Sequence, residues 1–216
     1  MQEFLKGVNR ALGVGIGYVP IAISFGALAT RSGLSDTAAV FMSVWVYAGA
    51  AQFAALEGIR QNLSWLSIVL TMLLMNLRHM PMSLAINPVF NRFNRKQQLF
   101  LAHGLTDEAF ALDVSDKPQS WHYYTGIHLF CWLSWILGTW IGCQLGQQIP
   151  AQWLQFALPS LFICLLTDNI KTWNQQTILT ILTGIVLVII LQNIGTLGIL
   201  VSILTVAAVA TLQKSS

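Results

Sequence analysis

Charged residues are scarce in this sequence, at 9% of 216 residues, whereas 55% are hydrophobic. Because a soluble domain of average composition carries about a quarter charged residues, this composition excludes an ordinary water-soluble protein. A membrane-crossing helix needs roughly 20 apolar residues, so the length allows at most about eight or nine spans with short loops. Almost nothing is left for a second domain, and we expect residues 1–216 to form one transmembrane domain.

Basic residues and cysteines are also few. The net charge is only +3, and the basic residues form no stripe that would follow nucleic-acid phosphates, so no nucleic-acid partner is expected. The expected surroundings are a lipid bilayer. Cys131, Cys143 and Cys164 lie in apolar runs without CxxC spacing, which indicates neither a disulfide framework nor a zinc site.

Catalytic and nucleotide-binding motifs are missing as well. The sequence contains no GxGxxG, no Walker lysine loop and no GxSxG elbow, and its histidines have no nucleophile at catalytic spacing. We therefore expect neither an enzyme nor a bound cofactor.

What the sequence does contain is a series of apolar segments. They fall near residues 11–30, 37–57, 64–86, 99–112, 121–146, 153–167, 176–191 and 195–212. This series predicts an all-α, polytopic transmembrane protein of about seven or eight segments. Lys6, Arg10 and Ala27-Leu28-Ala29 imitate a secretory signal, but the first run is longer than a signal core, and we expect a retained first span.

Two of these segments are too short to cross a bilayer upright. The fourth and sixth contain about 14 or 15 apolar residues, and a helix rises 1.5 Å per residue against a hydrocarbon core of about 30 Å. They are therefore predicted to be broken or re-entrant helices, which membranes tolerate where protein or a water-filled cavity satisfies the backbone.

The basic residues give two conflicting orientations. The cluster Arg92, Arg95 and Lys96 favours a cytoplasmic loop after the third segment, which would place the N-terminus outside. Lys6 and Arg10 favour an N-terminus inside. The two charge patterns agree only if one early segment does not cross the membrane, and the orientation stays open at this point.

A weak internal repeat links Tyr18-Val19-Pro20 with Ala157-Leu158-Pro159. Paired proline interruptions in two halves are typical of inverted-repeat transporters with broken helices, whose site lies near mid-membrane. Prolines that only kink two membrane helices would give the same pattern.

The first span is rich in glycine and contains Pro20, Ser24 and Gly26. Because proline removes one backbone donor, we expect this helix to be bent or opened around residues 16–20, where half-helix ends could bind a substrate. The alternative is close helix packing, since Gly13 and Gly17 form a GxxxG step.

Two further polar groups lie in the second and third segments. Gln52 ends a patch of small residues and could bind a polar solute or join two helices. Asn76 and Arg78 interrupt the third segment. An arginine within a bilayer must snorkel, pair or face water, so Arg78 either ends a helix or holds a carboxylate of the substrate or of the protein.

The clearest polar site is Thr106-Asp107-Glu108, with His103 one helical turn earlier and on the same face. Two adjacent carboxylates in an apolar run indicate proton carriers, although an interfacial loop with solvated charges would explain them too. A second Thr-Asp pair ends at Asp168, which is a further candidate for proton coupling or a surface partner of Lys171.

These residues resemble the AzlC family of branched-chain amino acid transporters. The resemblance rests on Gly17-Tyr18-Val19-Pro20 with Phe25 to Ala29, on Ala48 to Phe53, on Asn76-Leu77-Arg78-His79 and on Leu105-Thr106-Asp107-Glu108. It implies an exporter of leucine, isoleucine, valine and sometimes methionine in a bacterial inner membrane. It also implies a partner, a small membrane subunit of the AzlD type.

The resemblance and the residues together suggest alternating access driven by the proton gradient or by the substrate's own gradient. Pro20, Ser24, Gly26, Gln52, Asn76 and Arg78 are the candidates for substrate binding, and Asp107, Glu108, His103 and Asp168 those for proton coupling. A passive channel and an accessory structural membrane subunit are the alternatives.

Overall fold

The computed structural model describes residues 1–115, 119–146, 148–150, 175–191, 201–202 and 205–206. The chain divides into two compact units, Met1–Phe162 and Ile163–Ser216, which are described separately. All regular secondary structure in the described ranges is helical, which confirms the all-α prediction. The proposed repeat partner at Ala157 to Pro159 lies outside them.

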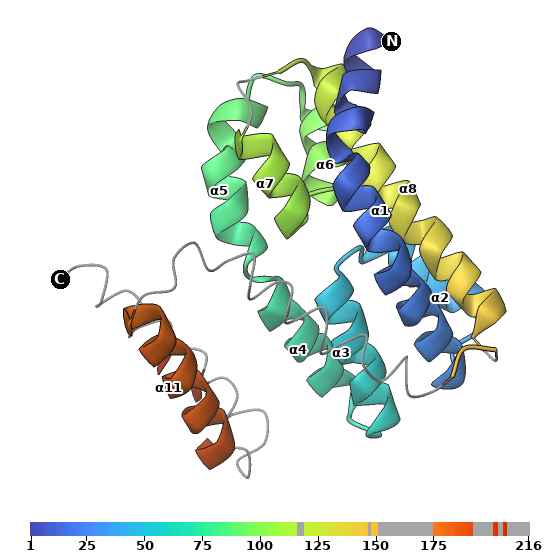
Figure 1. Cartoon of the computed structure of the whole chain (residues 1–216), viewed down its shortest axis with the longest axis vertical. Coiled ribbons are helices and arrows are strands. Elements are labelled where there is room, and N and C mark those ends of the chain that lie inside the picture. The colour runs from blue at the N-terminus through green and yellow to red at the C-terminus, as the bar shows by residue number, and fades with distance from the viewer. Residues whose placement is uncertain (116–118, 147, 151–174, 192–200, 203–204, 207–216) are drawn as a thin grey trace. The chain divides into compact units, whose positions relative to one another are not determined.

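The described helices of the first unit run in chain order from the N-terminus (Figure 1). They are α1 (Gln2–Arg31), α2 (Asp36–Trp45), α3 (Gly49–Arg60), α4 (Trp65–Asn76), α5 (His79–Phe90), α6 (Arg95–His103), α7 (Asp107–Ser115) and α8 (Trp121–Leu145). The second unit contains α11 (Gln175–Leu191).

Three described segments are long and apolar enough to cross a membrane: Gln2–Arg31, Trp65–Phe90 and Trp121–Leu145. The second of these joins α4 and α5. By contrast α2, α3, α6 and α7 have 10, 12, 9 and 9 residues. Each of these four is too short to cross a hydrocarbon core of about 30 Å alone.

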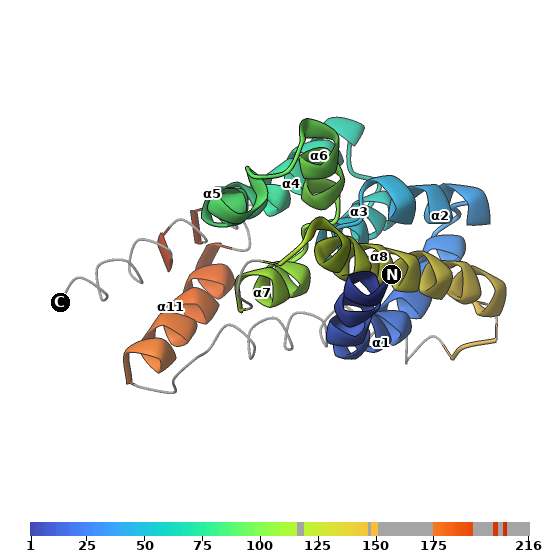
Figure 2. The same cartoon turned by 90° about the horizontal axis from the view of Figure 1, so that it is seen from above.

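Helices α1 and α8 lie side by side and run in the same direction (Figures 1 and 2). A Cβ atom added to Gly7 would lie 2.0 Å from the Tyr123 carbonyl oxygen, and one added to Gly26 would lie 2.1 Å from that of Thr139. Only glycine permits such an approach of two backbones. We call the end of this unit at which α1 and α8 begin the Arg10 end, and the end at which they finish the Arg31 end.

None of the described residues lies within 4 Å of a Cβ atom placed at Gly13 or Gly17, so packing through this step stays a prediction. The predicted opening of the first span is wrong, because α1 continues through Pro20 without a break. The glycines on the other face of α1 hold it against α8, and this packing keeps the helix whole.

Helices α2 and α3 form a re-entrant hairpin, hairpin A (Asp36–Arg60), which starts and ends at the Arg31 end. Along α8, Asp36 hydrogen-bonds Gln144 and Ser43 hydrogen-bonds Thr139, so α2 climbs toward the middle of the unit. The chain turns at Tyr47, which has a positive φ of 42°. On the return, the Phe53 ring of α3 packs 5.6 Å from that of Phe25 near the Arg31 end. The apolar segment at 37–57 is thus not a full span.

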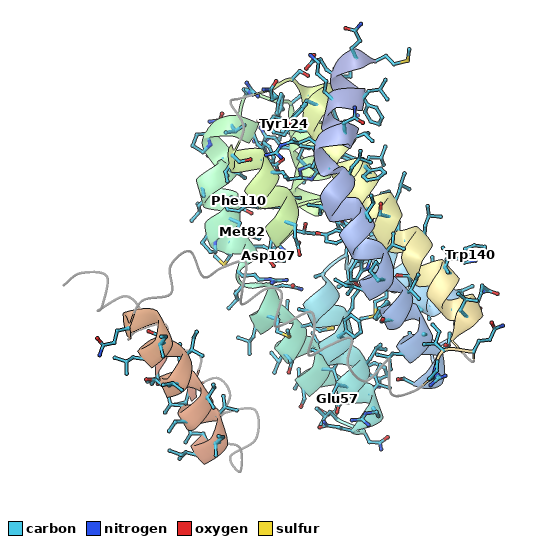
Figure 3. The ribbon with its side chains drawn as sticks, viewed as in Figure 1. Glu57, Met82, Asp107, Phe110, Tyr124 and Trp140 are labelled. Atoms are coloured by element: carbon cyan, nitrogen blue, oxygen red, sulfur yellow. The ribbon has the colours of Figure 1, made fainter. Side chains whose placement is uncertain are left out.

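Helices α6 and α7 form hairpin B (Arg95–Ser115), which enters from the opposite, Arg10 end. The Phe100 ring packs 5.7 Å from that of Trp121 at the start of α8, so α6 begins at this end. On the return, Ser115 at the close of α7 accepts a hydrogen bond from Arg10. Figure 3 shows Asp107 at the inner end of α7 and Phe110 one turn further toward the Arg10 end. The predicted interruption of the 99–112 segment is confirmed.

Between the hairpins, α4 and α5 cross from the Arg31 end to the Arg10 end. Ile68 of α4 packs on Gly58 near the close of hairpin A, while the Phe90 ring of α5 packs 5.4 Å from that of Tyr124. Helical hydrogen bonding lapses at Leu77 and Arg78, although both keep right-handed helical dihedrals. Pro81 lacks the N–H that would bind the Leu77 carbonyl, which explains an interruption at this point.

This topology removes the conflict over orientation. Since hairpin A does not cross, Lys6, Arg10 and the cluster Arg92, Arg95 and Lys96 all lie at the Arg10 end, and the positive-inside rule predicts that this end faces the cytoplasm.

Cysteine labelling tests this orientation. In a chain whose native cysteines are replaced, we expect Gln61→Cys to react with a membrane-impermeant maleimide added to intact cells. Asn91→Cys should react only after the cells are opened. Gln2→Cys, before hairpin A, is the deciding comparison, since Trp65–Phe90 separates Gln61 from Asn91 in either topology. It should be labelled like Asn91→Cys, and labelling like Gln61→Cys would show that hairpin A crosses the membrane.

Candidate functional site

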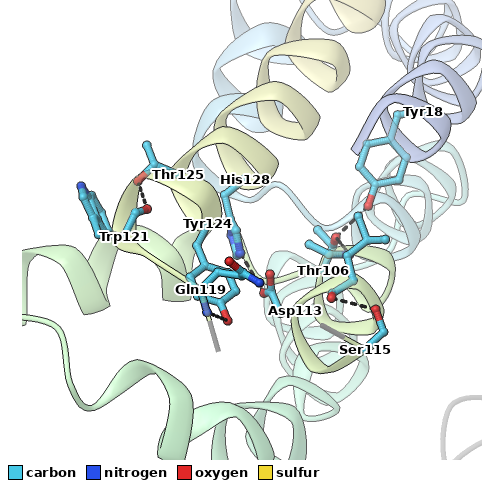
Figure 4. Close-up of polar contacts among 11 residues, drawn as sticks. Tyr18, Thr106, Asp113, Ser115, Gln119, Trp121, Tyr124, Thr125 and His128 are labelled. Carbon is cyan, nitrogen blue, oxygen red and sulfur yellow. Dashed lines mark hydrogen bonds and ion pairs between the residues drawn. The ribbon is translucent and has the colours of Figure 1, made fainter. Parts of the chain in front are cut away.

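The tip of hairpin B touches α1 half-way along its length (Figure 4). The Tyr18 hydroxyl donates a 2.6 Å hydrogen bond to Oε2 of Glu108 and lies 2.7 Å from Oγ1 of Thr106. Thr106 also caps α7, since its Oγ1 accepts a 3.2 Å bond from the Ala109 amide. Tyr18 is buried, so these bonds fix the tip to α1 away from bulk water.

The interruption in α4–α5 meets the same tip. Arg78 forms an ion pair with Asp107, with side chains 35% and 27% exposed. Of the alternatives for Arg78, the structure therefore shows it holding a carboxylate of the protein itself. Its Nε and the Asn76 Oδ1 are buried and have no hydrogen-bond partner among the described residues. One donor and one acceptor are thus left unsatisfied in this region.

The two hairpin tips are tied to each other. The Val44 carbonyl, left free because α2 ends at Trp45, accepts a 3.1 Å bond from Nε1 of Trp132 and lies 3.0 Å from Nε2 of His103. His103 closes α6 and Asp107 begins α7, so the prediction that they share a face of one continuous helix is wrong. Freed backbone at this depth is satisfied by protein groups, as membrane burial requires.

Gln52 is fully buried beside these tips and is held by the protein. Its amide nitrogen donates a 3.0 Å bond to Ser43, and its Oε1 accepts a 3.0 Å bond from the Trp135 indole. Ser43 in turn lies 2.8 Å from Oγ1 of Thr139. This network joins α2, α3 and α8, as the helix-joining alternative for Gln52 requires.

The remaining sequence candidates lie away from the tips. The Ser24 hydroxyl donates a 3.0 Å bond to the Pro20 carbonyl within α1, and Gly26 lies against the α8 backbone. Asp168 falls outside the described residues. Binding of substrate by Pro20, Ser24 or Gly26, and proton coupling by Asp168, stay predictions.

Three residues of this region were not among the predicted site residues: Tyr18, Asp113 and His128. His128 Nε2 lies 2.9 Å from Oδ2 of Asp113, with both side chains almost completely buried. They lie 15 residues apart on different helices, so no local spacing connects them. The only available signal was two titratable groups in apolar surroundings. Among the described residues, no group of three or more potential ligands could hold a metal ion.

The chain is similar to membrane proteins of bacteria. The family model described as "AzlC protein" matches residues 13–149. The inner membrane protein YgaZ of Escherichia coli is 32% identical over 193 residues, which cover 84% of this chain and 79% of that protein. An uncharacterized membrane protein of Helicobacter pylori is 32% identical over 192 residues, covering 82% of each.

A more distant relative bears a functional name. The branched-chain amino acid transport protein AzlC of Bacillus subtilis is 23% identical over 167 residues, covering 74% of this chain and 64% of that protein. No solved structure matches the chain. The matched region contains both hairpins and the ionisable residues between them, and by this match the chain belongs to the AzlC family of membrane proteins.

Proposed function

We propose that this protein is the large subunit of an exporter of branched-chain amino acids in a bacterial inner membrane. Leucine, isoleucine, valine and methionine are the proposed substrates, and a small membrane subunit of the AzlD type is the proposed partner. Membership of the AzlC family and the functional name of the Bacillus relative support this proposal. One structural observation carries it: the tips of two hairpins entering from opposite ends meet at Val44 and His103, and the tip of hairpin B also carries Asp107, paired with Arg78, and Glu108. We call this region the junction.

Such a junction offers groups that suit a zwitterion. The carboxylates of Asp107 and Glu108 can accept hydrogen bonds from a substrate ammonium group, and Arg78 can donate to a substrate carboxylate in a fork geometry. In this conformation the residues bind one another or Tyr18. We infer that substrate exchanges with these internal partners, which keeps the charges paired before and after binding.

The aliphatic side chain needs only an apolar wall. One methylene in such a pocket contributes about 1–3 kcal/mol to discrimination, so leucine, isoleucine, valine and methionine should compete with one another. A charged amino acid would bring an extra unpaired charge to mid-membrane, and this cost should exclude it.

Export would proceed by alternating access. Hairpin A closes the route from one end and hairpin B from the other. The Val44–His103 contact joins the two tips, while Trp132 holds the tip of hairpin A to α8 and Tyr18 holds that of hairpin B to α1. Release of one tip at a time would expose the junction to one side only. We propose that the proton gradient drives this cycle.

Efflux of radiolabelled leucine from preloaded cells tests the proposal. Cells that express the chain with its small partner should lose leucine faster than cells with an empty vector, and unlabelled valine should slow this loss. Equal efflux from both would contradict the proposal. Efflux that neither saturates nor responds to valine would favour a passive channel, and efflux that needs only the partner would favour an accessory role.

A further inference from the structure

A second pair of titratable groups joins hairpin B to α8, apart from the junction. His128 of α8 and Asp113 of α7 are 1% and 0% exposed, and the distance from Nε2 to Oδ2 is 2.9 Å (Figure 4). Asp113 lies five residues beyond Glu108 on α7, about 7.5 Å nearer the Arg10 end. The pair therefore lies between the junction and the end of the unit that carries the basic residues.

The His128 ring is wedged between the two arms of hairpin B. A Cβ atom added to Gly104, which follows α6, would lie 2.4 Å from Nδ1 and 2.9 Å from Cβ of His128. Asp113 on the returning arm binds the opposite side of the ring. A change in the volume or the hydrogen bonding of the ring therefore acts on both arms of hairpin B, and through them on the tip that carries Thr106, Asp107 and Glu108.

The two ring nitrogens differ in their partners. Because a carboxylate only accepts hydrogen bonds, the assignment that satisfies the pair puts a proton on Nε2 and a lone pair on Nδ1. No described residue hydrogen-bonds Nδ1, which faces Gly104. An unpaired lone pair is a small cost, whereas a second N–H at this position would be a buried charged donor without an acceptor, which is considerably more costly.

We infer that His128, oriented by Asp113, takes up the coupling proton, and that this proton releases the tip of hairpin B. The inference rests on the proposed transport function. A proton from water forms the Nδ1–H bond, and Asp113 stabilises the imidazolium through Nε2. The closed tip offers Nδ1 no acceptor. Protonated His128 therefore favours a tip displaced from the ring, where water or a backbone carbonyl can accept a hydrogen bond from Nδ1. Loss of the same proton to the other side restores the closed tip.

Other titratable groups face the pair from the neighbouring helices. Glu108 lies on α7, and Cys131 of α8 interacts electrostatically with both Glu108 and Asp113. From α1, Arg10 reaches Ser115 at the end of α7. Helix α5 contributes the Phe90 ring, 6.2 Å from the imidazole, and Tyr124 of α8 accepts a bond from the Gln119 amide. Among the titratable residues named here, only His128 contacts both Gly104 and a carboxylate.

Two transport modes measured in proteoliposomes separate the coupling from the substrate site. For His128→Gln in the full chain with its small partner, leucine–leucine exchange should persist. Accumulation of leucine driven by a pH gradient should fall at least about ten-fold. His122→Gln is the matched control, since His122 is an exposed histidine on the same helix α8, and it should leave both modes unchanged.

Asp113→Asn gives an independent readout. The asparagine oxygen can still accept from Nε2, but the charge that favours the imidazolium is gone. The pH at which transport is half-maximal should therefore move down by about one unit or more. An unmoved midpoint, or full pH-driven accumulation in His128→Gln, would overturn this inference. Absence of leucine exchange in the wild-type protein would instead contradict the proposed function itself.

Discussion

Replacing Gly142 with alanine should destabilise the first unit more than any comparable change outside the α1–α8 interface. A Cβ atom at this position would lie 2.1 Å from the Ile23 carbonyl oxygen and 2.8 Å from Ile23 Cα, and neither backbone can yield without separating α1 from α8. Overpacking of this kind costs about 1–3 kcal/mol, and more where only backbone can move. Thermal unfolding of the purified protein, followed by size-exclusion chromatography, measures the loss.

Gly17→Ala is the matched control for this prediction. It places the same methyl group on α1, where no described residue lies within 4 Å. Alanine is favoured over glycine in a helix by up to about 1 kcal/mol, so the control should be neutral or slightly stabilising. Equal losses of stability in the two variants would show that the close approach of α1 and α8 is wrong.

Neutralising Arg78 should have the largest effect on transport. Arg78→Gln leaves Asp107 without its cation at the hairpin tip, next to a second carboxylate on Glu108. An uncompensated charge at this depth favours other arrangements of the tip, so leucine efflux should fall at least about ten-fold. The double variant Arg78→Gln/Asp107→Asn should recover the amount of folded protein but not the efflux, because the proposed partner of the substrate carboxylate and one of the two proposed partners of its ammonium group are then missing.

Arg60→Gln is the control for the loss of an arginine from an ion pair. Arg60 pairs with Glu57 at 2.8 Å, but its side chain is 72% exposed at the end of hairpin A. Exposed pairs contribute little, so efflux should stay at the wild-type rate. If Arg60→Gln and Arg78→Gln reduced efflux equally, the effect would reflect surface charge rather than the junction.

The sequence predicted part of this arrangement for identifiable reasons. Scarcity of charge identified a polytopic all-α protein, and the shortness of the 99–112 segment predicted the break between α6 and α7. The sequence did not reveal hairpin A, because its arms of 10 and 12 mostly apolar residues together resemble one segment long enough to cross a membrane. Apolar length alone cannot distinguish a crossing helix from two half-length arms.

Position-specific errors came from contacts between distant segments. Pro20 suggested an opened helix, but α1 is held continuous by its packing on α8. The turn of hairpin A has no proline, and it occurs at Tyr47, whose left-handed backbone conformation is uncommon for a residue other than glycine. The Asp113–His128 pair joins separate helices, and nothing in the local sequence announces it.

Substrate protection of a cysteine at the hairpin tip tests the central claim most directly. In a chain without native cysteines, His103→Cys should react with a small thiol reagent, because His103 is exposed at the tip of hairpin B. Leucine should slow this reaction and glutamate should not, while labelling of Gln61→Cys outside the junction should be indifferent to both. A His103→Cys labelling rate that leucine leaves unchanged would contradict a solute site between the two hairpins.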